Sequence, residues 1–155
     1  MGFGPGRSVT ETAVVVDDGP LVIDTMIASM LMSRKPADAV ARYGPMLVGR
    51  PLVVSHVTVT ELRFGALAAG WGPNRLEALE ARLSAMTVVV PDDDLVWVCA
   101  RLRAAAKNAG LGLWAKDHEA DRWIAATAVR YDLPLVSDDS IFVGVPDLDL
   151  RQVPI

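Results

Sequence analysis

The chain has 155 residues, of which 52% are apolar and 22% are charged. Its length fits one domain, and its composition supports a packed core and excludes an intrinsically disordered protein. The formal net charge of −4 argues against the basic surface typical of nucleic-acid-binding domains, unless the acidic side chains gather around a bound cation that reverses the local charge.

Three features bear on where the protein acts. The single cysteine, Cys99, has no partner for an internal disulfide, which favours a reducing cytoplasm. No stretch approaches the roughly 20 apolar residues of a membrane span, so no membrane association is expected, and the start of the chain lacks the apolar region of a signal peptide. Residues 1–19 are expected to form a flexible extension and residues 20–155 the folded domain.

Short apolar runs alternate along the chain with stretches of helical periodicity. Uninterrupted β-branched runs are typical of buried parallel strands, and stretches opened by Ser, Pro or Asp and closed by Gly are typical of helices. The expected elements, in chain order, are strand 21–23, helix 25–33, helix 36–47, strand 52–54, helix 57–69, helix 73–85, strand 87–90, a helix from 91–94 to 109, helix 117–131, strand 133–136 and strand 150–153. This alternation predicts an α/β fold, a three-layer α/β/α sandwich with a mostly parallel central sheet.

Two aspartates follow strands that are wholly apolar. Asp24 ends strand 21–23, and Asp139 follows Val136 by three residues. Either residue alone would be interpreted as a helix or turn cap. In open parallel sheets, however, ligands bind beyond the carboxyl ends of the strands, and two aspartates from different strands there indicate a site.

Two further acids lie in predicted helices. Glu61 precedes Gly65 by one helical turn, and the missing side chain of that glycine would let a ligand or another backbone approach. Asp121 precedes the small-residue stretch 124–128, which suits close packing of a helix on a sheet. Asp117 lies on the same helical face as Asp121. It is either a fifth, outer acid of the site or an ordinary charged residue at the start of a helix.

Several converging carboxylates indicate a site for a hard divalent cation. Mg²⁺ takes oxygen ligands and binds through a few carboxylates plus substrate phosphate, whereas without a cation the carboxylates would repel one another. A bound cation can activate a water and stabilise charge on a phosphodiester. Such chemistry needs no nucleophilic Ser-His or Cys-His pair, which agrees with a chain whose only histidines are His56 and His118.

Four segments together resemble the PIN-domain nucleases, specifically the VapC-type toxins of type II toxin–antitoxin pairs. They are Val22–Thr25, Thr60–Gly65, Asp121–Ala128 and Leu135–Phe142, in the order and approximate spacing of that family. The resemblance covers about residues 20–153. It implies a PIN-like fold in which the four metal-binding and catalytic acids are Asp24, Glu61, Asp121 and Asp139. It also assigns supporting hydroxyls to Thr25 and to Ser137, which would help to hold the first acid or the metal.

The fourth acid depends on how the segment around residue 138 is aligned. The family pattern has a hydroxyl, a variable residue, an acid and then Phe three residues later. Counting back from Phe142 selects Asp139 and leaves Asp138 in the variable position. A slip of one residue would exchange the two aspartates.

The resemblance also implies an activity and partners. VapC-type toxins are Mg²⁺- or Mn²⁺-dependent endoribonucleases that cut tRNA or ribosomal RNA, form homodimers and are silenced by a cognate VapB-type antitoxin, which usually occupies the acidic groove. The basic candidates for RNA contact are Arg63, Lys116 and His118, together with Arg34, Lys35, Arg42 and Arg50. Trp71, Trp114 and Trp123 could stack on bases, although the spacing of Trp123 favours the core, and Trp97 is expected in the core.

Other classes of protein would predict different features in this sequence. A receiver-like signalling module would explain Asp17 and Asp18 after an apolar run, but it needs a phospho-acceptor aspartate where strand 52–54 is followed by Ser55. An aspartyl phosphatase needs an acid at the position of Met26. DNA flap nucleases share this type of fold but typically have longer chains. A catalytically inactive PIN-like binding module would not require all four acids.

Overall fold

The computed structural model describes residues 17–33 and 38–153. Within these residues the centre is a five-stranded sheet in the order β3-β2-β1-β4-β5, and every neighbouring pair is parallel. The strands are β1 (Leu21–Ile23), β2 (Leu52–Ser55), β3 (Thr87–Val89), β4 (Leu135–Val136) and β5 (Leu150–Arg151). The helices are α1 (Thr25–Met32), α2 (Asp38–Leu47), α3 (His56–Ala68), α4 (Pro73–Ser84), α5 (Asp93–Asn108) and α6 (Glu119–Arg130), with short 3₁₀ turns η1 (Gly112–Trp114), η2 (Lys116–His118) and η3 (Ser140–Phe142).

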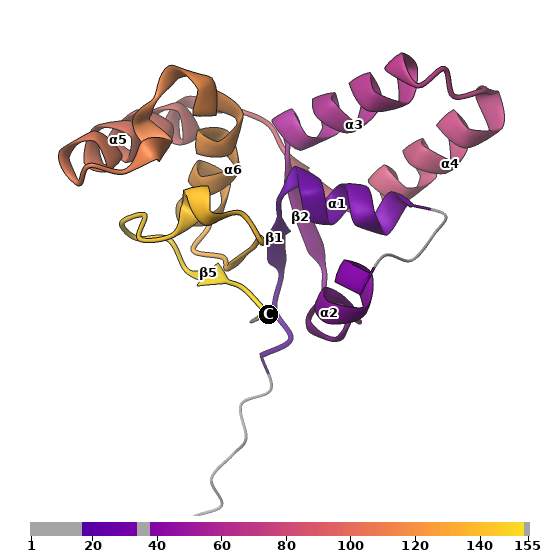
Figure 1. Ribbon diagram of the computed structural model, residues 1–155, viewed down its shortest axis with the longest axis horizontal. Helices are drawn as coiled ribbons and strands as arrows, with labels where there is room; N and C mark the ends of the chain where they lie inside the picture. Colours follow the sequence, from indigo (N-terminus) through magenta and orange to yellow (C-terminus); the bar gives the residue numbers. More distant parts are fainter. Residues whose placement is uncertain (1–16, 34–37, 154–155) are drawn as a thin grey trace, which may run out of the picture.

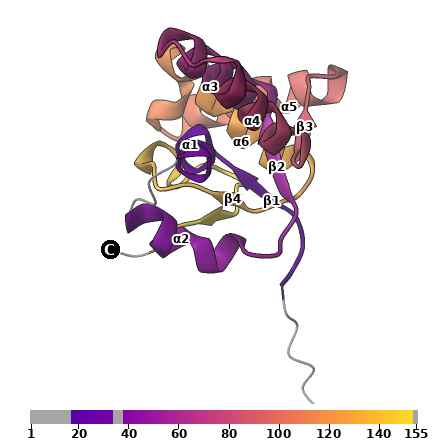
Figure 2. The same ribbon diagram turned by 90° about the vertical axis from the view of Figure 1, so that its right-hand side faces the viewer.

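Helices cover both faces of the sheet, which confirms the predicted three-layer sandwich. Figure 1 shows the sheet between α5 and α6 on one side and α1 to α4 on the other, and Figure 2 shows α1 to α4 in front of the strands. Side chains alternate along β1, so that Val22 packs in the core under α5 and α6 while Leu21 and Ile23 pack in the core under α1 to α4. All three are fully buried, as expected of a central strand with both faces covered.

Most helix starts are fixed by the residues that the sequence predicts. Asp24 caps α1 and Ser55 caps α3, each through a side-chain oxygen that accepts from a backbone N–H of the first turn. One predicted start is wrong. The helix expected from Asp117 begins instead at Glu119, because His118 has φ −106° and ψ 28°, outside the helical region, and separates η2 from α6.

Helix α5 is the longest helix within the described ranges, with 16 residues. It buries Leu95 and Leu102 against the sheet side. Trp97, which was expected in the core, points to solvent with 57% of its surface exposed, so that expectation is wrong. Across residues 17–33 and 38–153, no helix combines the length and the apolar character needed to cross a membrane.

Ordered contacts begin before the predicted domain start at residue 20. Arg50 donates through Nε to the carbonyl of Gly19 at 2.8 Å and through Nη2 to Asp17 Oδ1 at 3.1 Å, and Arg151 lies 3.5 Å from Asp17 Oδ2. Residues 17–19 are therefore held against the domain. Residues 1–16 of the predicted extension, and the candidates Arg34 and Lys35, lie outside the described residues.

The buried guanidinium of Arg122 connects α6 to η1. Arg122 is only 4% exposed, and its Nη1 donates to the carbonyl oxygens of Leu113 and Ala115. Replacing it with methionine keeps an aliphatic side chain but leaves both carbonyls without this donor. We expect Arg122→Met to lower the free energy of unfolding by about 2 kcal/mol, measured by urea denaturation.

A matched control is available on the surface. Arg63 forms an exposed ion pair with Glu80, and exposed pairs contribute little to stability, so Arg63→Met should leave the free energy of unfolding nearly unchanged. Equal losses in the two variants would contradict the structural role assigned to Arg122.

Candidate active site

The four acids that the sequence singles out line one pocket of about 440 Å³. Asp24 follows β1, Glu61 comes from α3, Asp121 from the first turn of α6 and Asp139 from the segment after β4. Thr25 and Ser29 of α1 also line it. Since β1 and β4 are adjacent parallel strands, the pocket lies beyond their carboxyl ends, where such sheets place ligands.

The carboxylates surround this space rather than meeting at one point. Across the described residues, no three acidic, histidine or cysteine side chains form a ready-made cluster of metal ligands. Asp24 is 4% exposed, whereas Glu61 lies exposed on α3. The site is therefore built from a buried acid at its base and more accessible acids around it.

Asp24 is held from two sides. Its Oδ1 accepts from the backbone N–H of Ile27 at 2.8 Å, and its Oδ2 accepts from the Ser137 hydroxyl. Burial raises the pKa of Asp24 above its ordinary value, and the nearby carboxylates of Asp139 and Asp121 add to the rise, while the two hydrogen bonds oppose it. The ionised form of Asp24 is thus disfavoured until positive charge arrives.

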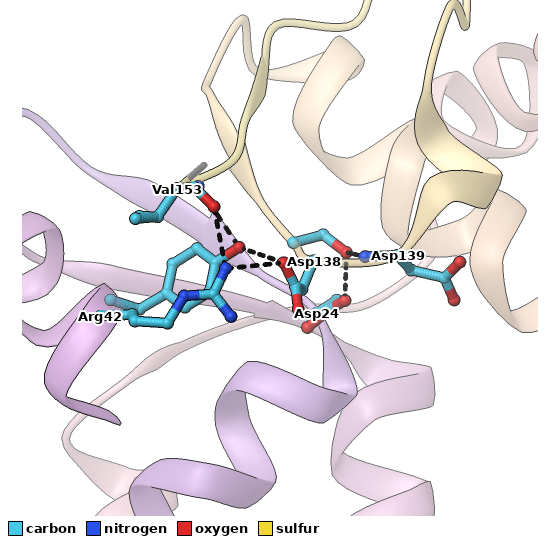
Figure 3. Close-up of polar contacts among 7 residues, drawn as sticks. Asp24, Arg42, Asp138, Asp139 and Val153 are labelled. Atoms are coloured by element: carbon cyan, nitrogen blue, oxygen red, sulfur yellow. Dashed lines mark hydrogen bonds and ion pairs between the residues drawn. The ribbon is translucent and has the colours of Figure 1, made fainter. Parts of the chain in front are cut away.

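The segment after β4 turns its two aspartates in opposite directions (Figure 3). Asp139 lines the pocket, and its Oδ1 accepts from the N–H of Ile141 at 2.9 Å, which starts η3. Phe142, three residues after Asp139, is 1% exposed and anchors η3 in the core. Asp138 points away and accepts from the Tyr43 hydroxyl at 2.7 Å. Geometrically, Asp139 belongs to the pocket and Asp138 does not.

Asp138 belongs to a second network that the sequence did not indicate (Figure 3). Tyr43 of α2 is 1% exposed, and its hydroxyl also accepts from the N–H of Val153 at 3.4 Å. Arg42 donates through Nη2 to the carbonyl of Val153 at 2.9 Å and lies 3.5 Å from Asp138 Oδ1. Burial and the bond with Asp138 raise the pKa of Tyr43. The network fixes the back of the loop that carries Ser137 and Asp139.

The remaining candidates are divided between the rim and the surface. His118 Nδ1 lies 2.9 Å from Asp121 Oδ2, and Thr25 Oγ1 lies 3.1 Å from the hydroxyl of buried Thr58. Asp117 and Lys116 are exposed in η2, and Asp117 does not line the pocket. Arg63 makes two hydrogen bonds, of 2.8 and 2.9 Å, to Glu80 of α4.

The raised pKa of Asp24 predicts how its removal affects stability. In the folded protein Asp24 holds its proton to a higher pH than in the unfolded chain, so folding loses stability as pH rises from the unfolded pKa to the folded pKa. We expect Asp24→Asn, which keeps an acceptor for Ile27, to raise the melting temperature of the metal-free protein at neutral pH. The gain should shrink toward about pH 4.

Thermal melts across pH measure this difference. Asp94→Asn removes an exposed carboxylate from the first turn of α5 and serves as the control. If the metal-free Asp24→Asn protein is less stable than the parent at neutral pH, the charge of Asp24 does not destabilise the fold, and this interpretation is wrong.

Comparison with known proteins agrees with this geometry. The sequence profile of the PIN domain family matches residues 21–148. The VapC ribonuclease Y4jK of Sinorhizobium fredii is 32% identical over 136 residues, covering 84% of this chain and 94% of the relative. A chain in the crystal structure of VapBC2 from Rickettsia felis, bound to a promoter DNA fragment, has a TM-score of 0.70 at 18% identity and covers 87% of this chain and 99% of its own length.

A second solved structure is VapBC-5 from Mycobacterium tuberculosis, a member of the VapBC family of toxin–antitoxin systems. Its chain has a TM-score of 0.57 at 25% identity and covers 88% of this chain and 98% of its own length. The match to the family profile spans most of the sequence and includes all four acids of the pocket. The chain therefore belongs to the PIN domain family and is a VapC-type member of it.

Proposed function

We propose that this protein is a metal-dependent endoribonuclease that acts as the toxin of a toxin–antitoxin pair and cuts phosphodiester bonds in tRNA or ribosomal RNA. The observation that carries the proposal is the single pocket lined by Asp24, Glu61, Asp121 and Asp139. A relative named as a ribonuclease supports the activity. The lone Cys99 suits action in a reducing cytoplasm, where those RNAs are found.

The pocket fits Mg²⁺ or Mn²⁺. Its lining supplies carboxylate and hydroxyl oxygens, which hard cations prefer, and Mg²⁺ in proteins usually keeps several waters beside a few carboxylates. Asp24, Asp121, Asp139 and Glu61 would hold it. When bound, the cation supplies an activated water and stabilises charge on the phosphodiester.

The protein's own groups set the geometry for this chemistry. Ser137 and the N–H of Ile27 orient the two oxygens of Asp24, so its carboxylate has one fixed direction. Asp139 is fixed by η3 and by its own N–H, which donates to Ser137 Oγ at 3.0 Å. His118 is held at the rim by Asp121, where an imidazole N–H can donate to a phosphate oxygen.

A groove next to the acids provides a place for the antitoxin. A second pocket, of about 500 Å³, shares Thr25, Ser29 and Glu61 with the acidic pocket and continues between α1, α3 and α4 past Trp71. A VapB-type antitoxin bound there would place a basic side chain among the carboxylates. Solved relatives that are VapBC complexes support this partner.

Helix α3 carries exposed apolar side chains that bear on the proposed homodimer. Phe64 and Leu67 of α3 are 71% and 67% exposed, and apolar side chains this exposed suit a homodimer contact.

A receiver-like module has little support, because Asp17 pairs with Arg50 and Arg151 instead of lining the acidic pocket.

Cleavage of cellular RNA tests the function directly. Purified protein free of antitoxin should produce discrete cuts in total RNA with Mg²⁺ or Mn²⁺, mapped by sequencing the fragment ends. EDTA should abolish them, and Asp24→Asn should cleave no more than the metal-free parent. If Asp24→Asn cleaves as well as the parent, the proposed site is wrong, and a parent that binds Mn²⁺ but cuts no RNA would favour the inactive binding module.

The network behind the site gives a second test. Tyr43→Phe removes the hydroxyl that holds Asp138 and accepts from Val153, while the buried ring remains. Because groups that orient metal ligands typically contribute 10–100-fold to affinity or activity, we expect the Mn²⁺ affinity, followed by electron paramagnetic resonance, to fall by about tenfold.

Two variants define the cause of that loss. Asp138→Asn keeps an acceptor for the Tyr43 hydroxyl and should bind Mn²⁺ almost as well as the parent. Asp138→Ala should resemble Tyr43→Phe. Parental Mn²⁺ affinity in both Tyr43→Phe and Asp138→Ala would show that the network does not position the acids.

A further inference from the structure

One face of the protein has the opposite charge to its acidic pocket. Residues 95–116, which include most of α5 and all of η1, contain no Asp or Glu in a chain whose net charge is −4. They contain four basic residues, which are Arg101, Arg103, Lys107 and Lys116. Acids flank the segment: Asp94 pairs with Arg130 at 3.0 Å, Asp117 follows Lys116, and exposed Glu119 of α6 lies close enough to Cys99 of α5 to interact with it electrostatically.

The basic side chains on this face lie against exposed tryptophans. The Lys107 ammonium lies 5.3 Å from the centre of the Trp114 ring, and the Arg101 guanidinium lies 5.7 Å from that of Trp97. Trp114 and Trp97 are 41% and 57% exposed. Arg103 donates through Nε to the carbonyl of Trp114 at 3.0 Å and so ties η1 to α5. We call these five residues the α5–η1 face.

This face is rigidly joined to the wall of the acidic pocket. The buried Arg122 of α6 donates to the carbonyls of Leu113 and Ala115 on either side of Trp114. Its neighbour in the sequence, Asp121, lines the pocket. The N–H of His118 also donates to the carbonyl of Ala115 at 3.1 Å, and its ring contacts Asp121. A chain bound on η1 is therefore held in a fixed position relative to Asp121 at the pocket wall.

We propose that the α5–η1 face, continued by Lys116, is an RNA-binding surface outside the catalytic pocket. Phosphates contact Arg101, Lys107 and Lys116, and an unpaired base stacks on the Trp114 ring. The proposal rests on the proposed ribonuclease function, which supplies RNA as the ligand. Charge complementarity selects the occupant, because a polyanion matches a segment with four basic side chains and no acids of its own, and exposed aromatic rings beside cations suit bases.

The surface also explains how an acidic protein can hold RNA. Carboxylates repel phosphate groups, so the acidic pocket alone attracts RNA only after it binds cations. A basic face joined to the pocket wall through Arg122 supplies affinity that does not require the divalent metal. Binding of RNA in EDTA therefore reports on the α5–η1 face and separates it from catalysis.

The experiment measures binding of fluorescently labelled bulk tRNA to full-length Asp24→Asn protein in EDTA. In that background, the Arg101→Gln/Lys107→Gln pair should weaken binding about tenfold and reduce the slope of log affinity against log salt by about two. Arg82→Gln/Arg151→Gln removes the same charge from other surfaces and should weaken binding less than twofold. Trp114→Ala should also weaken binding, and Trp114→Phe, which keeps a ring, should restore most of it.

Each result has one meaning. If the Arg101/Lys107 pair binds tRNA as well as the control pair, or if the Asp24→Asn protein binds no tRNA in EDTA, the surface proposal is wrong. A change in the oligomeric mass of the Arg101/Lys107 pair, measured by light scattering, would make this face a protein interface and also overturn it. If the parent shows no metal-dependent cleavage, the nuclease function is contradicted instead. The binding measurements are independent of that result, because they need no cleavage.

Discussion

The hydrogen bond from Ser137 to Asp24 joins the ends of the two central strands, and the acidic pocket depends on it. Parallel pairing of Ile23 with Val136 brings the residues after β1 and β4 to one edge of the sheet. Asp24 then caps α1 while it accepts from Ser137. The same carboxylate therefore starts a helix, locks two strand ends together and supplies the buried base of the site.

This arrangement has an electrostatic cost that a purely structural aspartate would avoid. Burial and the nearby Asp139 and Asp121 all raise the pKa of Asp24, so its charge opposes folding at neutral pH. Serine and a backbone N–H offset part of that cost. Strain of this kind is characteristic of functional sites, where stability is traded for a geometry that a ligand later completes. A divalent cation would complete this one.

The sequence predicts those parts of the fold and of the site that depend on local residue pattern and on the order of the elements. Apolar runs and cap residues locate the strands and most helices, and parallel topology then places Asp24 and Asp139 together. Trp97 is different, because in the uniformly apolar run 95–100 nothing marks which side chains face the sheet, and the predicted helix buries Leu95 and exposes Trp97. Tyr43 meets Asp138 across 95 residues of chain, and no local signal marks such a contact, although a buried tyrosine hydroxyl always needs a partner.

Net charge is a poor guide to what this protein can bind, because acidic and basic side chains gather in different parts of the structure. The acids that matter converge from four segments on one pocket, while residues 95–116 carry basic side chains alone. Arg122 bridges the two regions, since its helix presents Asp121 to the pocket and its guanidinium holds the turn that presents Trp114. If both proposals hold, the acids would set the affinity for the cation and the basic face would set the affinity for RNA, so the two could change separately. The net charge of −4 hides this separation, because the charges of the four pocket acids and of the four basic residues in 95–116 cancel in the sum.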